Sequence, residues 1–421
     1  MTAPSDSRTL VKAASVNLLG MVARASRTLV TLFVTRVAGA GVFGIFTVAT
    51  AAVEVVSRFT IFGMDKSLLK FLPEKDSPYP VLSAAFRTAL ILGFLATLVV
   101  TWGADWIAEV LLKTPAAGRP LRVAAVAILP LTFTFLLMAA TKALKIMRYD
   151  ALVMGFVLPL SLLLFAVPIL WASDDALTLA LAYGASAGAA GLVALWFFGK
   201  HFSIPRAFLT PPGRSMGEMV SFSTPLGLAD FVQFLGMKLE LFVLAFFMSP
   251  VSLGIYALAA ELSLVIKKFR QIFDPIIIPI MAEAYGLDQR ARLRENVARV
   301  IRWILMLGVF YVVGMVLFGP PILSIFGEEF AVGGTVLILL CLAQLLNVGT
   351  GLLDMAMMVS GRPRINLLNV CILLVLQTGL NIWLIPRYGM LGAGMAALTA
   401  FLVLALVRLV QSLWILKLSP F

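Results

Sequence analysis

The chain has 421 residues, of which 61% are hydrophobic and 13% are charged, and its mean hydropathy is +1.02. This much apolar surface exceeds what one aqueous core can bury, so the composition excludes a soluble globular protein and predicts a protein of the lipid bilayer. The formal net charge is +12. A nucleic-acid partner is excluded, because the basic residues are not interleaved with aromatic residues in a soluble domain.

Apolar segments separated by polar or Gly/Pro breaks follow one another along the whole chain. A helix needs about 20 apolar residues to cross the hydrocarbon of a membrane. We therefore predict an all-α integral membrane protein with about twelve transmembrane helices, six in each half. Their predicted ranges are 15–37, 43–64, 84–107, 121–140, 151–171, 177–198, 219–248, 253–277, 301–318, 332–358, 367–385 and 391–416.

Lysines and arginines gather on alternate loops, which is the pattern that orients helices in a membrane. They lie near the N-terminus and in the loops around residues 66–75, 142–148, 200–214, 290–294 and 362–364. The intervening loops are neutral or acidic apart from Lys113, Arg119 and Arg387, and Asp174-Asp175 and Glu328-Glu329 are the plainest cases. We therefore expect both termini in the cytoplasm, with attraction to anionic lipid as a secondary effect of the basic charge.

The two halves of the sequence repeat one pattern. At an offset of about 210 residues, Phe43-Gly44-Ile45-Phe46 aligns with Leu253-Gly254-Ile255-Tyr256, and Arg58-Phe59 aligns with Lys268-Phe269. Six helices in each half give both copies the same orientation, so we expect two parallel-repeat lobes around a central cavity. The predicted domains are an N-terminal six-helix lobe over 1–199, a cytoplasmic linker over 200–214 and a C-terminal six-helix lobe over 215–421. This duplicated architecture is typical of transporters.

The predicted linker carries Pro205, Pro211 and Pro212, which indicate a connection that does not pack tightly. His201, the one histidine of the chain, also lies there and is expected to be an ordinary solvated residue.

Charged residues inside the predicted helices are the candidate functional residues, because each costs several kcal/mol unless it faces a polar interior or a partner. Guanidinium and ammonium groups bind phosphate oxygens well. A central cavity lined by cations would therefore suit an anionic headgroup, and the predicted substrate-binding residues are Arg24, Arg27, Arg58, Lys238 and Lys268. Three nearby acids could exchange protons or sodium during a transport cycle, or could only balance the cations: Asp230, Glu240 and Asp354.

Some of the charged residues, and both cysteines, could have a structural role instead of a functional one. Glu54 and Arg58 lie one helical turn apart and could form an ion pair that ties helices together. Arg408 is expected to be an interfacial anchor. Cys341 and Cys371 both lie in apolar runs, where a thiol usually behaves as a small buried hydrophobe, and we predict neither a disulfide nor a metal site.

Residues 32–74 resemble the opening of polysaccharide-biosynthesis membrane proteins of the oligosaccharide flippase family. The core of this segment reads VTRVAGAGVFGIFTVATAAVEVVSRFTIFGMDKSLLKFLPE. In this segment one helix ends in a turn of small residues, and the second helix begins with a glycine and an aromatic residue. A later glycine is followed by a basic stretch that ends in a proline and an acidic residue. Further similarities are Pro275 to Pro279, and Asn381 to Gly389 followed by Gly392-Ala393. At the level of spacing, the resemblance covers most of the chain.

This resemblance implies a non-enzymatic member of the multidrug, oligosaccharidyl-lipid and polysaccharide exporter superfamily. It implies a flippase that moves a polyprenyl-pyrophosphate-linked oligosaccharide across the cytoplasmic (inner) membrane by alternating access. The oligosaccharide would be the repeat unit of a surface polysaccharide such as an O-antigen or an exopolysaccharide. No cofactor is implied beyond coupling to H+ or Na+. The implied partners are the lipid-linked glycan, membrane lipids, a glycan polymerase and assembly proteins.

A multidrug and toxin extrusion type cation antiporter, which shares this fold, is the main alternative. It would prefer an acidic cavity, to which the three acids named above could contribute. A major facilitator protein would carry a basic, glycine-rich loop after its second helix, where this chain reads PEKDSPYP. A membrane glycosyltransferase or polymerase would normally need a sizeable extramembrane loop, and a non-transporting scaffold would leave the buried charges unexplained.

Overall fold

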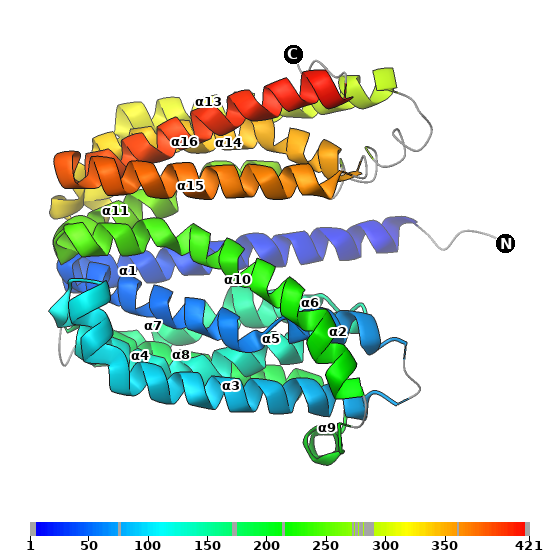
Figure 1. Ribbon diagram of the computed structural model, residues 1–421. Helices are drawn as coiled ribbons and strands as arrows, with labels where there is room; N and C mark the ends of the chain where they lie inside the picture. Colours follow the sequence, from blue (N-terminus) through cyan, green and yellow to red (C-terminus); the bar gives the residue numbers. More distant parts are fainter. Residues whose placement is uncertain are drawn as a thin grey trace. The chain divides into compact units, whose positions relative to one another are not determined.

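The structure is a computed structural model, and all regular secondary structure in its described residues is helical (Figure 1). It describes residues 6–74, 77–170, 175–212, 215–271, 273, 277, 281, 290–359 and 362–416. Only the backbone is described over residues 6–27, 169–170, 215, 290–297, 358–359, 363 and 415–416.

The chain divides into two compact units, and the first is Met1–Lys238. Short 3-10 and π-helical turns extend or join several of its helices. The α-helices are α1 (Asp6–Ile61), α2 (Met64–Phe71), α3 (Tyr79–Trp106), α4 (Gly118–Ala124), α5 (Ile128–Ala143), α6 (Arg148–Leu152), α7 (Leu158–Leu170), α8 (Ala176–Gly199), α9 (Ile204–Leu209) and the first part of α10 (Ser215–Phe247).

The second unit is Leu239–Phe421, and it begins with the remainder of α10. Its α16 packs against α14 and α15, and Ala393, Ala396, Ala397 and Ala400 form a buried stripe of small side chains on it. The other α-helices of this unit are α11 (Pro250–Ser263), α13 (Arg290–Phe326), α14 (Gly334–Val359), α15 (Pro363–Tyr388) and α16 (Met390–Gln411).

Helix α1 contains two of the predicted membrane helices. Gly39 interrupts it with a non-helical backbone, φ 76° and ψ 174°, within the predicted small-residue turn. A positive φ favours glycine, which has no Cβ to clash with the backbone. Figure 1 shows the two blue segments of α1 running in opposite directions, so the prediction of two helices separated by a turn is confirmed.

Ten helical segments of the described residues are long and apolar enough to cross a membrane. Thr28–Ile61 counts as one of the ten, although it spans the break at Gly39. Helix α10 has 33 residues, carries Glu218, Asp230, Lys238 and Glu240, and is not among them. Dividing Thr28–Ile61 at Gly39 and adding α10 raises the number from ten to the predicted twelve. The predicted fold class, an all-α integral membrane protein, is therefore confirmed, and the protein is a multi-pass membrane protein.

The expectation of a loosely packed linker is wrong for residues 202–210. Phe202 and Ala207 are buried, and the ring of Phe208 stacks on that of Phe86 with centroids 5.0 Å apart. The guanidinium of Arg87 in α3 donates to the carbonyl oxygens of residues 208 and 210 at 3.5 and 3.4 Å. Proline in the first turn is compatible with a helix, so the prolines did not prevent α9 from forming and packing.

The first part of α10 packs against the junction of α1 and α2 with direct backbone contact. A Cβ on Gly63 would lie 2.5 Å from the carbonyl oxygen of Ser223, and a Cβ on Gly227 would lie 2.5 Å from the nitrogen of Gly63. The hydroxyls of Ser67 and Ser223 are 2.5 Å apart and share a hydrogen bond. This part of α10 therefore belongs to the first compact unit, although the predicted C-terminal lobe begins at residue 215. A compact unit is a set of residues in mutual contact, whereas a lobe is one copy of the sequence repeat. The two kinds of boundary need not coincide, so the predicted lobe boundaries stay a prediction.

Candidate functional site

Helix α10 directs two charged side chains to different partners. Lys238 and Glu240 are two residues apart, and residues at this spacing do not share a helix face. The Nζ of Lys238 lies 2.8 Å from Oε2 of Glu54 in α1, whereas Glu240 contacts residues of α11 and α15. The charges of Lys238 and Glu240 therefore belong to two separate clusters, one in each compact unit.

The cationic cluster of the first unit consists of Glu54, Arg58, Phe135, Phe234 and Lys238. The Cζ of Arg58 lies 3.9 Å from the ring centroid of Phe135 and 5.4 Å from that of Phe234. The Nζ of Lys238 lies 5.7 Å from the same Phe234 ring. Two of the predicted substrate-binding residues, Arg58 and Lys238, therefore share one aromatic side chain.

The alternative of an ion pair between Glu54 and Arg58 is wrong. Glu54 pairs with Lys238 instead, because α10 brings that ammonium group to the carboxylate. Among the residues that the structure describes, Arg58 contacts no carboxylate and no other hydrogen-bond acceptor. A cation–π contact engages the face of a guanidinium group and leaves the N–H donors at its edge for an anionic ligand. Arg58 is half-buried, so those donors remain accessible.

Two of the three predicted ion-coupling acids are paired with basic residues. Oδ2 of Asp230 lies 3.1 Å from Nζ of Lys66, and Oδ2 of Asp354 lies 2.5 Å from Nη2 of Arg408. Lys66 lies in α2, outside the membrane-spanning segments. Burial alone would lower the pKa of Lys66, but the carboxylates of Asp65 and Asp230 outweigh this effect, and the pKa is raised above its ordinary value.

Glu240 differs from the other two acids because its carboxylate is held by neutral donors. The hydroxyl of Tyr256 donates to Oε1, and Nε2 of Gln377 donates to Oε2 at 2.8 Å. Within the described part of the chain, Glu240 contacts no lysine or arginine. A carboxylate in a membrane helix is costly without a cationic partner, so a proton or a sodium ion could neutralise this one.

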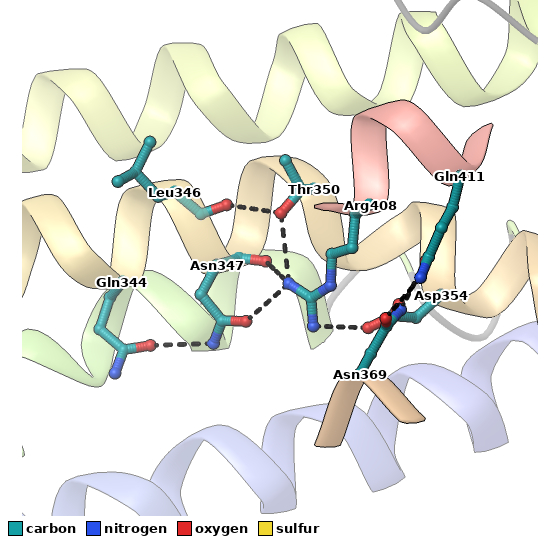
Figure 2. A network of polar contacts seen from close by, with 8 residues as sticks. All are labelled: Gln344, Leu346, Asn347, Thr350, Asp354, Asn369, Arg408 and Gln411. Atoms are coloured by element: carbon teal, nitrogen blue, oxygen red, sulfur yellow. Dashed lines mark hydrogen bonds and ion pairs between the residues drawn. The ribbon is translucent and has the colours of Figure 1, made fainter. Parts of the chain in front are cut away.

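The expectation that Arg408 is an interfacial anchor is wrong, because its side chain is buried with a relative exposure of 8%. Figure 2 shows its guanidinium in a polar network between α14, α15 and α16. Nη1 donates to Oδ1 of Asn347 and to Oγ1 of Thr350, both at 3.2 Å, while Nη2 meets Asp354. Asn347, Thr350 and Asp354 are spaced three and four residues apart on α14, so one helix face presents all three. This spacing was the sequence signal for the network.

Two amides complete the network. Nδ2 of Asn369 donates to Oδ1 of Asp354 at 2.9 Å, and Asn369 and Gln411 exchange hydrogen bonds of 2.8 and 2.9 Å (Figure 2). Both carboxylate oxygens of Asp354 therefore have partners, whereas Nε of Arg408 is buried and has none among the described residues. This arrangement supports a structural role for Asp354 in the second unit.

Three predicted substrate-binding residues are not brought into a described cluster. Lys268 is half-buried in the helical segment 265–271. The side chains of Arg24 and Arg27 lie outside the described residues. Cys341 is buried, whereas Cys371 lies on the surface of α15, within a segment that is apolar enough to cross a membrane.

A multi-pass helical membrane protein with charged residues inside its spans is the class that the fold and the site define. The sequence model of a family described as "Polysaccharide biosynthesis protein" matches residues 33–332, which is more than two thirds of the chain. The chain belongs to this family of polysaccharide biosynthesis proteins, and the resemblance seen in the sequence is confirmed. No curated protein matches the sequence.

Solved structures of transporters and flippases share the fold. The lipid II flippase MurJ in an inward closed conformation matches with a TM-score of 0.80 and 12% identity, over 94% of this chain and 87% of that one. An inward-facing multidrug resistance MATE family transporter of the MOP superfamily matches with a TM-score of 0.73 and 15% identity, over 91% and 92%. The MATE multidrug transporter DinF-BH, solved as a complex, matches with a TM-score of 0.68 and 16% identity, over 97% and 95%. At such identities the likeness concerns the fold alone.

Proposed function

We propose that this protein is a flippase for a polyprenyl-pyrophosphate-linked oligosaccharide, the repeat unit of a surface polysaccharide, in the cytoplasmic membrane. The observation that carries the proposal is the guanidinium of Arg58, which two phenylalanine rings hold inside a membrane helix and which no described carboxylate neutralises. Guanidinium groups bind pyrophosphate oxygens through paired, charge-assisted hydrogen bonds. Membership of a polysaccharide biosynthesis family supports a glycan carrier as the source of that pyrophosphate.

Lys238 is the second cation of the proposed substrate site. Its ammonium group is paired with Glu54, so a pyrophosphate would compete with that carboxylate for the same cation. We also assign Arg24, Arg27 and Lys268 to the substrate path, on the strength of their positions in the sequence. Transport would proceed by alternating access of two six-helix lobes, 1–199 and 215–421.

Glu240 is the acid that we assign to ion coupling. Asp230 and Asp354 each have a lysine or arginine partner, and their proposed role in coupling is weaker for that reason. Among the described residues, the partners of Glu240 are a tyrosine hydroxyl and a glutamine amide, so its charge can change without stranding a described buried cation. Binding of H+ or Na+ at Glu240 would link the transport cycle to an ion gradient.

A cation antiporter is the second candidate function. Glu240 favours it, because a carboxylate that no described lysine or arginine contacts could bind an organic cation in the same place. Two of the structures with this fold are multidrug transporters. Arg58 argues against this function, since a guanidinium that no described carboxylate neutralises would repel such a substrate.

Replacing Glu240 with glutamine should remove the response of transport to an ion gradient while leaving substrate binding in place. Wild-type protein in proteoliposomes should move a lipid-linked oligosaccharide between leaflets faster when a proton or sodium gradient is imposed. Glu240→Gln keeps the side-chain shape but cannot carry the charge, so its rate should equal the wild-type rate without a gradient. The rate is measured as the fraction of glycan that an added lectin can reach.

Asp230→Asn in the same proteoliposomes is the matched control, because Asp230 is already paired with Lys66. It should retain the acceleration by the gradient. A Glu240→Gln protein that responds to the gradient like the wild type would remove Glu240 from the coupling step. Failure of the wild-type protein to move any lipid-linked oligosaccharide would contradict the flippase proposal itself.

A further inference from the structure

An aromatic stack lies at the end of α8, beside the loop that leads into α6. The ring of Tyr149 stacks on Phe197 with centroids 4.2 Å apart and planes inclined by 18°, and the rings of Trp196 and Phe197 lie 4.9 Å apart. The hydroxyl of Tyr149 also lies 3.3 Å from Nε2 of His201. His201 is exposed, in agreement with the expectation of a solvated residue, and this contact links it to the ring of Tyr149.

Two cations lie on the aromatic stack. The Nζ of Lys200 is 3.4 Å from the ring centroid of Trp196, and the Cζ of Arg148 is 5.1 Å from that of Tyr149. Both side chains are exposed, and in the described part of the chain neither contacts a carboxylate. Lys142 in the same region is different, because its Nζ lies 2.9 Å from Oδ2 of Asp150. The aromatic stack therefore carries two positive charges that no described acid compensates.

The same end of the first unit exposes large apolar side chains. Met147 is 70% exposed, Trp196 is 59% exposed and Leu192, one turn before Trp196, is 71% exposed. Tryptophan beside lysine and arginine at a helix end is typical of the membrane–water interface. The loops around residues 142–148 and 200–214 are basic, so this is the expected cytoplasmic end, where anionic lipids give the leaflet a negative surface.

We propose that Arg148 and Lys200 form a headgroup site for an anionic phospholipid of the cytoplasmic leaflet. The phosphate accepts hydrogen bonds from the two cations, and the acyl chain lies over Trp196 and Leu192. The aromatic stack holds both cations at the interface, so that little side-chain freedom is lost on binding. Zwitterionic phospholipids fit less well, because their own cation faces the same positive charges. This proposal does not depend on the transported substrate.

The test is a titration of the purified full-length protein in neutral detergent with tail-labelled phosphatidylglycerol and, separately, phosphatidylcholine. The Arg148→Gln/Lys200→Gln variant should bind phosphatidylglycerol about 30-fold more weakly than the wild type, since each surface cation contributes about a fivefold gain in affinity for an anionic lipid. Lys142→Gln is the matched control and should bind like the wild type, because Lys142 is already neutralised. All three changes are on side chains at the surface, and an unchanged size-exclusion profile verifies the fold.

Three results would overturn the proposal. Equal affinity of the wild type for phosphatidylcholine and phosphatidylglycerol would show that the headgroup charge is not recognised. An equal loss of affinity in Lys142→Gln would show a diffuse charge effect in place of a site. Displacement of the labelled lipid by an equal concentration of glycerol phosphate would show a site for a free phosphate and not for a lipid.

Discussion

Replacing Arg58 with glutamate should abolish display of surface glycan in a strain that lacks the native gene. The change removes the guanidinium that Phe135 and Phe234 hold, and it places a second carboxylate one helical turn from Glu54. Lost hydrogen bonds to a charged ligand cost about 1.5–3 kcal/mol, and repulsion of a pyrophosphate adds to this, so the rate should fall about 100-fold or more. The amount of surface glycan per cell, at equal membrane level of the protein, is the measurement.

Two further variants separate the roles of charge and geometry at this position. Arg58→Lys keeps the positive charge but loses the planar fork of donors, so it should display an intermediate amount of glycan. Phe135→Leu keeps Arg58 but removes the closer ring, and should also give an intermediate result. Normal glycan display by Arg58→Glu would contradict a substrate role for this residue.

Replacing Asp354 with alanine should destabilise the second unit strongly. Arg408 is buried, and Asp354 supplies the carboxylate that neutralises it (Figure 2). Removing one partner of a buried ion pair leaves an uncompensated charge, which costs about 3–5 kcal/mol. Thermal unfolding of the purified protein in detergent should therefore begin at a clearly lower temperature than for the wild type.

The double variant Asp354→Ala/Arg408→Leu distinguishes a structural pair from an ion-coupling acid. Replacing a whole buried pair by apolar side chains is often neutral, so the double variant should recover much of the stability lost in Asp354→Ala. A double variant that is no more stable than Asp354→Ala would show that the pair is not the source of the loss. Unchanged stability of Asp354→Ala together with lost gradient response would instead assign Asp354 to ion coupling.

The helices could be predicted from the sequence because the hydropathy of a segment indicates whether lipid or water surrounds it. Each predicted range has a helical counterpart wherever the structure describes the chain, and Gly39 breaks α1 within the expected turn. The packing of the linker could not be predicted, because three prolines in a short segment indicate a loose connection. The apolar side chains of Phe202, Ala207 and Phe208 indicate the opposite. Two of them are buried and Phe208 stacks on Phe86 of α3, a surface that no local pattern reveals.

The residue types of the site could be predicted from the sequence, whereas the partners could not. Spacing placed Glu54 and Arg58 on one helix face, yet Glu54 pairs with Lys238, about 180 positions later in the chain. Likewise, Glu240 differs from the other two acids because Tyr256 and Gln377 hydrogen-bond its carboxylate, and these residues come from two other helices. Local periodicity identifies which side chains need a partner, and tertiary packing decides which partner each receives.

The position of the lipid-linked glycan in cells that lack this protein tests the central claim most directly. Spheroplasts of a deletion strain would be treated with an impermeant glycosidase, and the cleaved fraction of the lipid-linked oligosaccharide would be compared with that in the complemented strain. The flippase account predicts that the oligosaccharide accumulates in the inner leaflet, protected from the enzyme, while sensitivity to cationic dyes is unaltered. A normal cleaved fraction, together with a selective rise in dye sensitivity, would contradict this account and identify a cation antiporter.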